Sequence, residues 1–125
     1  MKVFLDDLRF APTEYDMVFR NAESFLKWLE ENPDQEITKL SLDHDLGEGL
    51  MDGYDMVKKM VLLPNKIESI QFHTDNLVGL KNMYYYIKNA IDNGLMVNLK
   101  TIRTHKVNTI DGVETVSPYK LFRIG

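Results

Sequence analysis

Cysteine is absent from this sequence, which excludes disulfide bonds and metal sites built on thiolates. Long hydrophobic runs are absent too, and none approaches the roughly 20 apolar residues that a membrane-spanning helix needs. The opening residues MKVFLDDLR become acidic too soon for a secretory signal peptide. From these absences we expect a cytoplasmic protein with no membrane association.

Several common enzyme motifs are also missing: the glycine-rich phosphate loop, the serine nucleophile elbow and the His-Glu-x-x-His zinc motif. Positive charge is scarce, with 15 Lys and Arg against 19 Asp and Glu. Because a DNA-binding protein needs a broad basic face, we do not expect sequence-specific DNA binding. A compact anionic ligand, held by a metal and a few cations, suits this balance better.

Strands and helices alternate along most of the chain. β-forming apolar runs predict strands at 2–5, 15–19, 37–42 and 67–73. Helical spacing of apolar residues predicts helices at about 21–31, 53–63 and 77–92. This alternation predicts an α/β fold of three layers, α/β/α, with a mostly parallel sheet between helices on both faces.

The last thirty residues have a different character. Two β-rich stretches, 97–107 and 114–124, flank a turn signal with an Asp-Gly pair and predict a β-hairpin, one strand of which could join the main sheet. The hairpin's cations could contact RNA, or the hairpin could simply cover a sheet edge. No linker or repeat separates it, so we expect one domain over 1–125, with a core to about 94 and the extension from about 95.

Polar clusters follow three of the predicted strands. In parallel sheets, ligands bind beyond the carboxyl ends of the strands, so these clusters are expected to meet at one edge. The clusters are Asp6, Asp7 and Arg9; Asp43, His44 and Asp45; and His73, Asp75 and Asn76.

Carboxylates at this density predict a divalent cation. Asp6, Asp7, Asp43 and Asp45 are the candidate metal ligands, because hard oxygen donors suit Mg²⁺ and added imidazole shifts the preference towards Mn²⁺. Without a cation, such a group would repel itself and raise one carboxyl pKa. The competing interpretation is that Asp6 and Asp7 cap a turn, and that Asp45 does the same in its own loop.

The remaining polar residues suggest phosphate chemistry. His44 or His73 could move a proton near neutral pH, and with Asp43 they form the candidate catalytic set. Arg9 could neutralise a phosphate, and Asn76 could orient one of its oxygens. The alternatives are that Asn76 caps the following helix and that His73 is a hydrogen-bonded core histidine.

These motifs resemble a known family. VFLDDLR, LSLDHDLG with the following GYD, and the H-x-x-N spacing from His73 to Asn76 resemble the cyclic-phosphate processing receiver-like domains, over roughly residues 1 to 92. These derive from response-regulator receivers, whose acidic pair and phosphoacceptor match Asp6, Asp7 and Asp43. The resemblance implies a receiver-like (flavodoxin-like) fold and cleavage of cyclic phosphates in RNA repair or nucleotide metabolism.

Taken together, the sequence predicts a metal-assisted phosphoesterase, with Mg²⁺ or Mn²⁺ as cofactor. Its expected substrate is a cyclic or terminal phosphate on a small phosphorylated nucleotide or an RNA end. The alternative is a non-catalytic receiver-like module that binds a partner or takes part in signalling.

Overall fold

The structure is a computed structural model that describes residues 1–47, 50–74, 76–110 and 113–123. Side chains are described as far as Arg103, with Leu77 excepted. Glu48, Asp75 and the Asp-Gly pair of the predicted hairpin turn lie outside the described residues.

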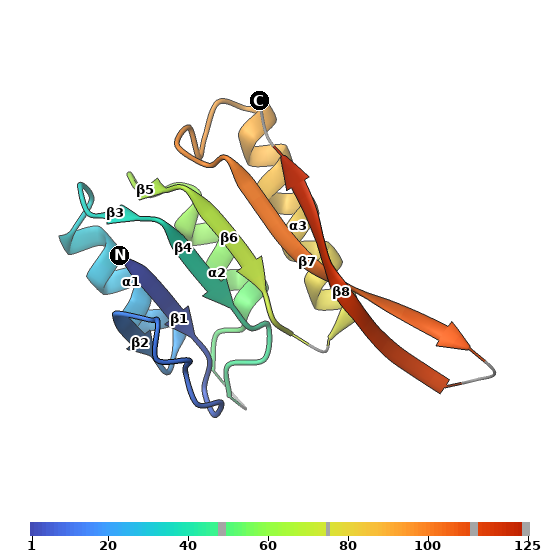
Figure 1. Cartoon of the computed structure of the whole chain (residues 1–125). Helices are drawn as coiled ribbons and strands as arrows, with labels where there is room; N and C mark the ends of the chain where they lie inside the picture. Colours follow the sequence, from blue (N-terminus) through green and yellow to red (C-terminus); the bar gives the residue numbers. More distant parts are fainter. Residues whose placement is uncertain (48–49, 75, 111–112, 124–125) are drawn as a thin grey trace.

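The main sheet has six strands in the order β2-β1-β4-β6-β7-β8 (Figure 1). The first five are parallel, and β8 runs antiparallel to β7. This confirms the receiver-like α/β class, the mostly parallel sheet and the C-terminal hairpin, whose first strand joins the main sheet. The strands are β1 (Lys2–Leu5), β2 (Met17–Phe19), β4 (Lys39–Leu42), β6 (Ser69–Phe72), β7 (Thr101–Ile110) and β8 (Val113–Arg123). Two short strands, β3 (Glu36–Ile37) and β5 (Lys66–Ile67), pair separately.

Three helices connect the parallel strands: α1 (Ala22–Glu31), α2 (Gly53–Met60) and α3 (Leu77–Asp92). Each begins after a capping side chain that accepts a backbone N–H three residues on: Asn21, Asp52 and Asn76. Helix α2 is shorter than predicted. Its last residues form tighter turns, with Leu63 N–H donating to the Met60 carbonyl, because the following Pro64 disfavours helical geometry before it.

The helices of the described residues lie on one face of the sheet (Figure 1), whereas the sequence predicted helices on both faces. The sheet order explains the difference. Each helix crosses the sheet in the same direction, from β2 to β4, β4 to β6 and β6 to β7, and right-handed crossovers in one direction place their helices on one face. The β1–β2 connection crosses in the other direction, and no helix forms there.

Side-chain alternation follows this layering. The strand residues in the hydrophobic core pack under the helices; they are Val3, Leu5, Leu40, Leu42, Ile70, Phe72 and Ile102. Positions of the opposite parity are mostly polar and partly exposed, as at Lys2, Lys39, Ser69, Gln71 and Thr101. The alternation continues for one residue beyond each strand. Asp6, Asp43 and His73 occupy these positions on the face opposite the helices, so they lie on the same side of the sheet edge.

None of the helices in the described part of the chain is long and apolar enough to cross a membrane.

Candidate metal and phosphate site

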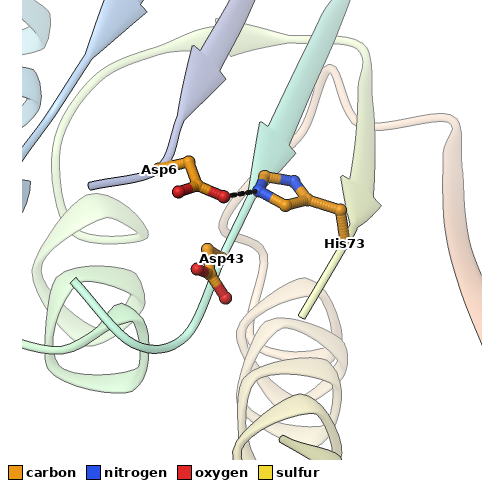
Figure 2. A group of neighbouring side chains, drawn as sticks. All are labelled: Asp6, Asp43 and His73. Carbon is orange, nitrogen blue, oxygen red and sulfur yellow. Dashed lines mark hydrogen bonds and ion pairs between the residues drawn. The ribbon is translucent and has the colours of Figure 1, made fainter. Parts of the chain in front are cut away.

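Three side chains converge where β1, β4 and β6 end (Figure 2). Asp6, Asp43 and His73 each offer one ligand atom, and these atoms all lie within 4.8 Å of one another. Both carboxyl side chains are buried, with Asp6 only 1% exposed and Asp43 8%. The residues come from positions far apart in the sequence, so the sheet itself assembles the group.

Asp6 is fixed by four groups around its carboxylate. Its Oδ1 accepts the backbone N–H groups of Leu8 and Arg9, both at 2.9 Å. Its Oδ2 lies 2.8 Å from His73 Nε2 and 3.8 Å from Arg9 Nε. The loop turn made by Leu8 and Arg9 is the capping role that we considered as the alternative for Asp6. The same carboxylate therefore closes the turn and faces the cluster.

Asp43 is held by the start of the loop that follows β4. Its Oδ1 accepts the backbone N–H of His44 at 2.8 Å, and the Thr74 hydroxyl donates a hydrogen bond to its side chain. Thr74 is fully buried. Both bonds orient a carboxylate that has little contact with water.

His73 links Asp6 to the strand beside it. Its Nε2 lies 2.8 Å from Asp6 Oδ2 and its Nδ1 lies 2.7 Å from Ser41 Oγ. Its ring stacks on Phe4, with centroids 4.7 Å apart and planes 5° apart. Because an ionised carboxylate can only accept, Nε2 carries a hydrogen, and in the neutral ring the Ser41 hydroxyl then donates to Nδ1. The ring is therefore fixed in both position and tautomer.

The three pKa values are shifted in different directions. Burial raises the pKa of Asp43, and the neighbouring charge of Asp6 adds to this effect against the hydrogen bond from Thr74. Burial alone would also raise the pKa of Asp6, but the N–H groups of Arg9 and Leu8, together with His73, lower it below the ordinary value. Burial lowers the pKa of His73, although Asp6 and Asp43 oppose the shift. Near neutral pH the group thus contains a neutral imidazole and at least one buried negative charge.

The donor set fits a divalent cation. Bonds of about 2.0 to 2.2 Å place opposite ligands of an octahedral ion about 4.0 to 4.4 Å apart, which the observed limit of 4.8 Å accommodates. Two carboxylates suit Mg²⁺. His73 directs an N–H at Asp6 in the tautomer described above, so it would bind a cation such as Mn²⁺ only after Nε2 lost that hydrogen. Burial, with the charge of Asp6 added to it, raises the pKa of Asp43, and a cation here would offset both effects.

Arg9 lies at the edge of this group. Its Nη1 donates to the His73 carbonyl at 2.5 Å, and its side chain is 46% exposed. Arg20 holds the same loop, donating to the carbonyl groups of Asp6 at 3.2 Å and Arg9 at 2.5 Å. Arg9 thus presents a half-exposed guanidinium beside Asp6, Asp43 and His73, and its role in phosphate binding stays a prediction.

Other candidate residues gather in a second group around His44. His44 Nδ1 lies 3.0 Å from Asp45 Oδ1 and 3.2 Å from Asn76 Nδ2, while its Nε2 lies 3.6 Å from Asp52. Asn76 also caps α3 through Gly79 N–H at 2.9 Å, as the alternative interpretation expected. Asp45 is 69% exposed. Neither His44 nor Asp45 belongs to the group formed by Asp6, Asp43 and His73 among the described residues.

Asp7 is also outside the converging group, although it directly follows Asp6 and is half-buried. The roles predicted for Asp7 and Asp45 as metal ligands, for His44 in proton transfer and for Asn76 in phosphate binding stay predictions. The candidate residues nevertheless fall into two groups. We call Asp6, Asp43 and His73 the buried group, and the residues around His44 the peripheral group.

Comparison with known protein families now adds to this geometry. The family described as the cyclic-phosphate processing Receiver domain matches residues 1–89, more than two thirds of the chain. The chain belongs to this family. Comparisons with curated proteins and with solved structures give no significant match. In this cyclic-phosphate processing receiver domain the match covers the strands that carry the buried group and ends within α3, before β7 and β8.

Sequence reasoning missed several supporting residues of this receiver domain. Ser41 and Phe4 contact His73, and Arg20 holds the loop that carries Arg9. Thr74, by contrast, loosely matches the hydroxyl-bearing residue of response-regulator receivers, and it bonds to Asp43. Ser41 gave a usable signal, since a serine between two leucines of a buried strand needs a hydrogen-bond partner. The others depend on contacts between distant segments.

Proposed function

We propose that this receiver domain hydrolyses a cyclic phosphate, opening it to a phosphomonoester on a nucleotide or an RNA end. The observation that carries the proposal is the convergence of Asp6, Asp43 and His73 at the sheet edge, with Arg9 beside them. Membership of a cyclic-phosphate processing family supports the same class of substrate.

Each residue has a distinct role in this scheme. Asp6 and Asp43 would hold Mg²⁺ or Mn²⁺, which, when bound, supplies a polarised phosphoryl oxygen and a more acidic water. Arg9 offers N–H donors to a phosphate oxygen from its half-exposed position. Ser41 and Phe4 keep the His73 imidazole oriented towards Asp6.

His73 is the group that we assign to proton transfer. Ring opening adds water across one P–O bond: the water oxygen bonds to phosphorus, and the ester oxygen leaves with a proton. The attacking water loses one proton and the leaving oxygen gains one, so a single imidazole can take the first and return the second. The lowered pKa of His73, caused by its burial, favours the neutral form. In the tautomer described above, Nδ1 is the nitrogen that can accept a proton, and the Ser41 hydroxyl bonded to it would pass the proton on.

The direct test uses the full chain with a 2′,3′-cyclic nucleotide and Mn²⁺ or Mg²⁺, with the product identified by phosphorus NMR. We expect a 2′- or 3′-monophosphate from the wild type, and none from a variant carrying both Asp6→Asn and Asp43→Asn. Each asparagine retains one oxygen that can accept a hydrogen bond, while the variant loses both negative charges. An intact substrate after prolonged incubation with either metal would overturn the proposal.

One observation favours a second candidate function, a non-catalytic signalling or binding module. Asp43 matches the receiver phosphoacceptor position, and a buried hydroxyl from Thr74 bonds to it. For this candidate we expect acetyl phosphate and Mg²⁺ to phosphorylate Asp43, which mass spectrometry would detect and Asp43→Asn would prevent. An unmodified Asp43 would count against it.

A further inference from the structure

Several exposed apolar side chains come from segments that follow β1, β4 and β6, the strands whose ends carry Asp6, Asp43 and His73. Among the described residues, four of the large hydrophobic side chains with high exposure follow strand ends on this edge: Leu8 (85% exposed), Phe10 (96%), Leu50 (55%) and Val78 (71%). They lie in the β1–β2 loop, the β4–α2 loop and the first turn of α3, segments that follow the lower ends of β1, β4 and β6 in Figure 1. Grouped apolar exposure around a polar centre is typical of a ligand site.

The loop that carries Phe10 is held firmly. Asp6 Oδ1 accepts two of its N–H groups, Arg20 binds two of its carbonyl groups, and Arg9 reaches across to the His73 carbonyl. Exposing a phenylalanine forgoes the stabilisation that its burial would supply. A braced loop that nevertheless presents an aromatic ring to solvent is suited to recognition.

Phe10 is also close to the buried carboxylate. The N–H of Arg9 lies 2.9 Å from Asp6 Oδ1, and standard backbone dimensions then place the Phe10 Cα within about 8 Å of that oxygen. This distance is comparable to the separation between the phosphate and the base of one nucleotide. The backbone at Phe10 thus lies about one nucleotide's length from Asp6, and Arg9 directly precedes it in the chain.

We propose that Phe10 stacks on the nucleobase next to the phosphate, so that the site takes nucleoside phosphates in preference to base-free phosphates. The inference rests on the proposed function, because it assigns the substrate of the same site. Stacking on one aromatic ring is tolerant of base identity, since every base has a π-face. Phe10 is therefore a binding residue that selects for a base without selecting which one.

Calorimetry on the full chain with Mn²⁺ separates this inference from the proposed function, using adenosine 3′-monophosphate and inorganic phosphate as probes. We expect Phe10→Ala to weaken nucleotide binding by about 5- to 150-fold and to leave phosphate binding unchanged. Phe10→Trp should retain nucleotide binding, whereas Phe10→Leu should weaken it, because leucine is apolar but has no π-face. Leu62→Ala is the matched control, since Leu62 is 71% exposed but follows α2, outside these loops.

Equal nucleotide affinity in the wild type and Phe10→Ala, with phosphate still bound, would overturn the inference and leave the proposed function standing. A wild type that binds neither probe would overturn both. Self-association of the wild type that Phe10→Ala abolishes, with unchanged nucleotide affinity, would assign the exposed ring to a second copy of the chain and also overturn the inference.

Discussion

The two histidines that follow neighbouring strands of the sheet have very different surroundings. The His73 side chain is 8% exposed, and both of its ring nitrogens are bonded to buried side chains, those of Asp6 and Ser41. His44 is bonded to Asp45 and Asp52, side chains that are 69% and 41% exposed. The two imidazoles are therefore similarly exposed, 8% for His73 and 14% for His44, but His73 is bonded to buried partners and His44 to partly exposed ones.

The difference arises because successive residues at a strand end point to opposite faces of the sheet. Asp6, Asp43 and His73 continue the parity of the helix-free face and meet, while Asp7 and His44, one residue further on, do not join them. Electrostatic interactions are stronger and more specific where water is excluded. Chemistry and metal binding should therefore depend on the buried group, and the peripheral group should contribute mainly to its shape.

The largest expected effect sharpens this contrast. His73→Ala should lower turnover of a 2′,3′-cyclic nucleotide by roughly a hundredfold or more, because a proton carrier is lost. His44→Ala should cause a much smaller loss in the same assay. His73→Gln serves as the control: it keeps a donor for Asp6 but cannot exchange a proton. Full activity in His73→Gln would limit His73 to a structural role.

Stabilisation by a metal ion should depend on the carboxylates of the buried group and not on the neighbouring ones. Mn²⁺ at a hundred times its dissociation constant should stabilise the wild-type fold by about 2.7 kcal/mol, measured as a rise in melting temperature. Asp6→Asn with Asp43→Asn should abolish that rise, because the two charges that would hold the ion are removed. Asp7→Asn with Asp45→Asn is the matched control and should respond like the wild type. An equal rise in melting temperature in both double variants would show that the metal does not depend on the buried carboxylates.

Two glycines provide a third comparison. A Cβ on Gly53 would lie 2.4 Å from the Asp43 carbonyl oxygen, whereas a Cβ on Gly79 would lie 2.4 Å from the His44 ring. Gly53→Ala should lower the free energy of unfolding by about 1 to 3 kcal/mol and weaken Mn²⁺ binding, because backbone at the buried group must move.

Gly79→Ala should cost less, because the His44 side chain can rotate and alanine favours a helix. Its Mn²⁺ affinity should remain unchanged. Urea unfolding and metal titration measure both quantities, and a loss of metal affinity in Gly79→Ala alone would reverse the assignment of the two groups.

The smallest expected effect concerns pH. Because the folded-state pKa of Asp43 is raised by burial and by Asp6, its ionisation disfavours the folded state at pH values above that pKa. Metal-free Asp43→Asn should therefore be more stable than the wild type at neutral pH, and this advantage should shrink as the pH falls towards the ordinary value of 3.8. Thermal unfolding across this range measures it. An advantage that grows on acidification would contradict the assigned direction.

Much of the fold could be read from local patterns. The alternating strands and helices, the polar clusters after three strands and the caps at Asn21, Asp52 and Asn76 all depend on nearby residues. The placement of helices could not be read in this way, because it depends on the direction in which each connection crosses the sheet. The absence of a helix between β1 and β2 is what leaves the second face of the sheet without a helix there.

The candidate site, too, was only partly predictable from local patterns. The sequence by itself determined that carboxylates, imidazoles and an arginine follow the strands, and its motifs pointed to the receiver family. Only the tertiary structure decided which of them converge: the bond between Asp6 and His73 joins residues 67 positions apart. Neighbouring acids such as Asp6 and Asp7 are chemically alike, and it is the direction imposed by each strand end, together with burial against distant segments, that makes one of them part of the buried group.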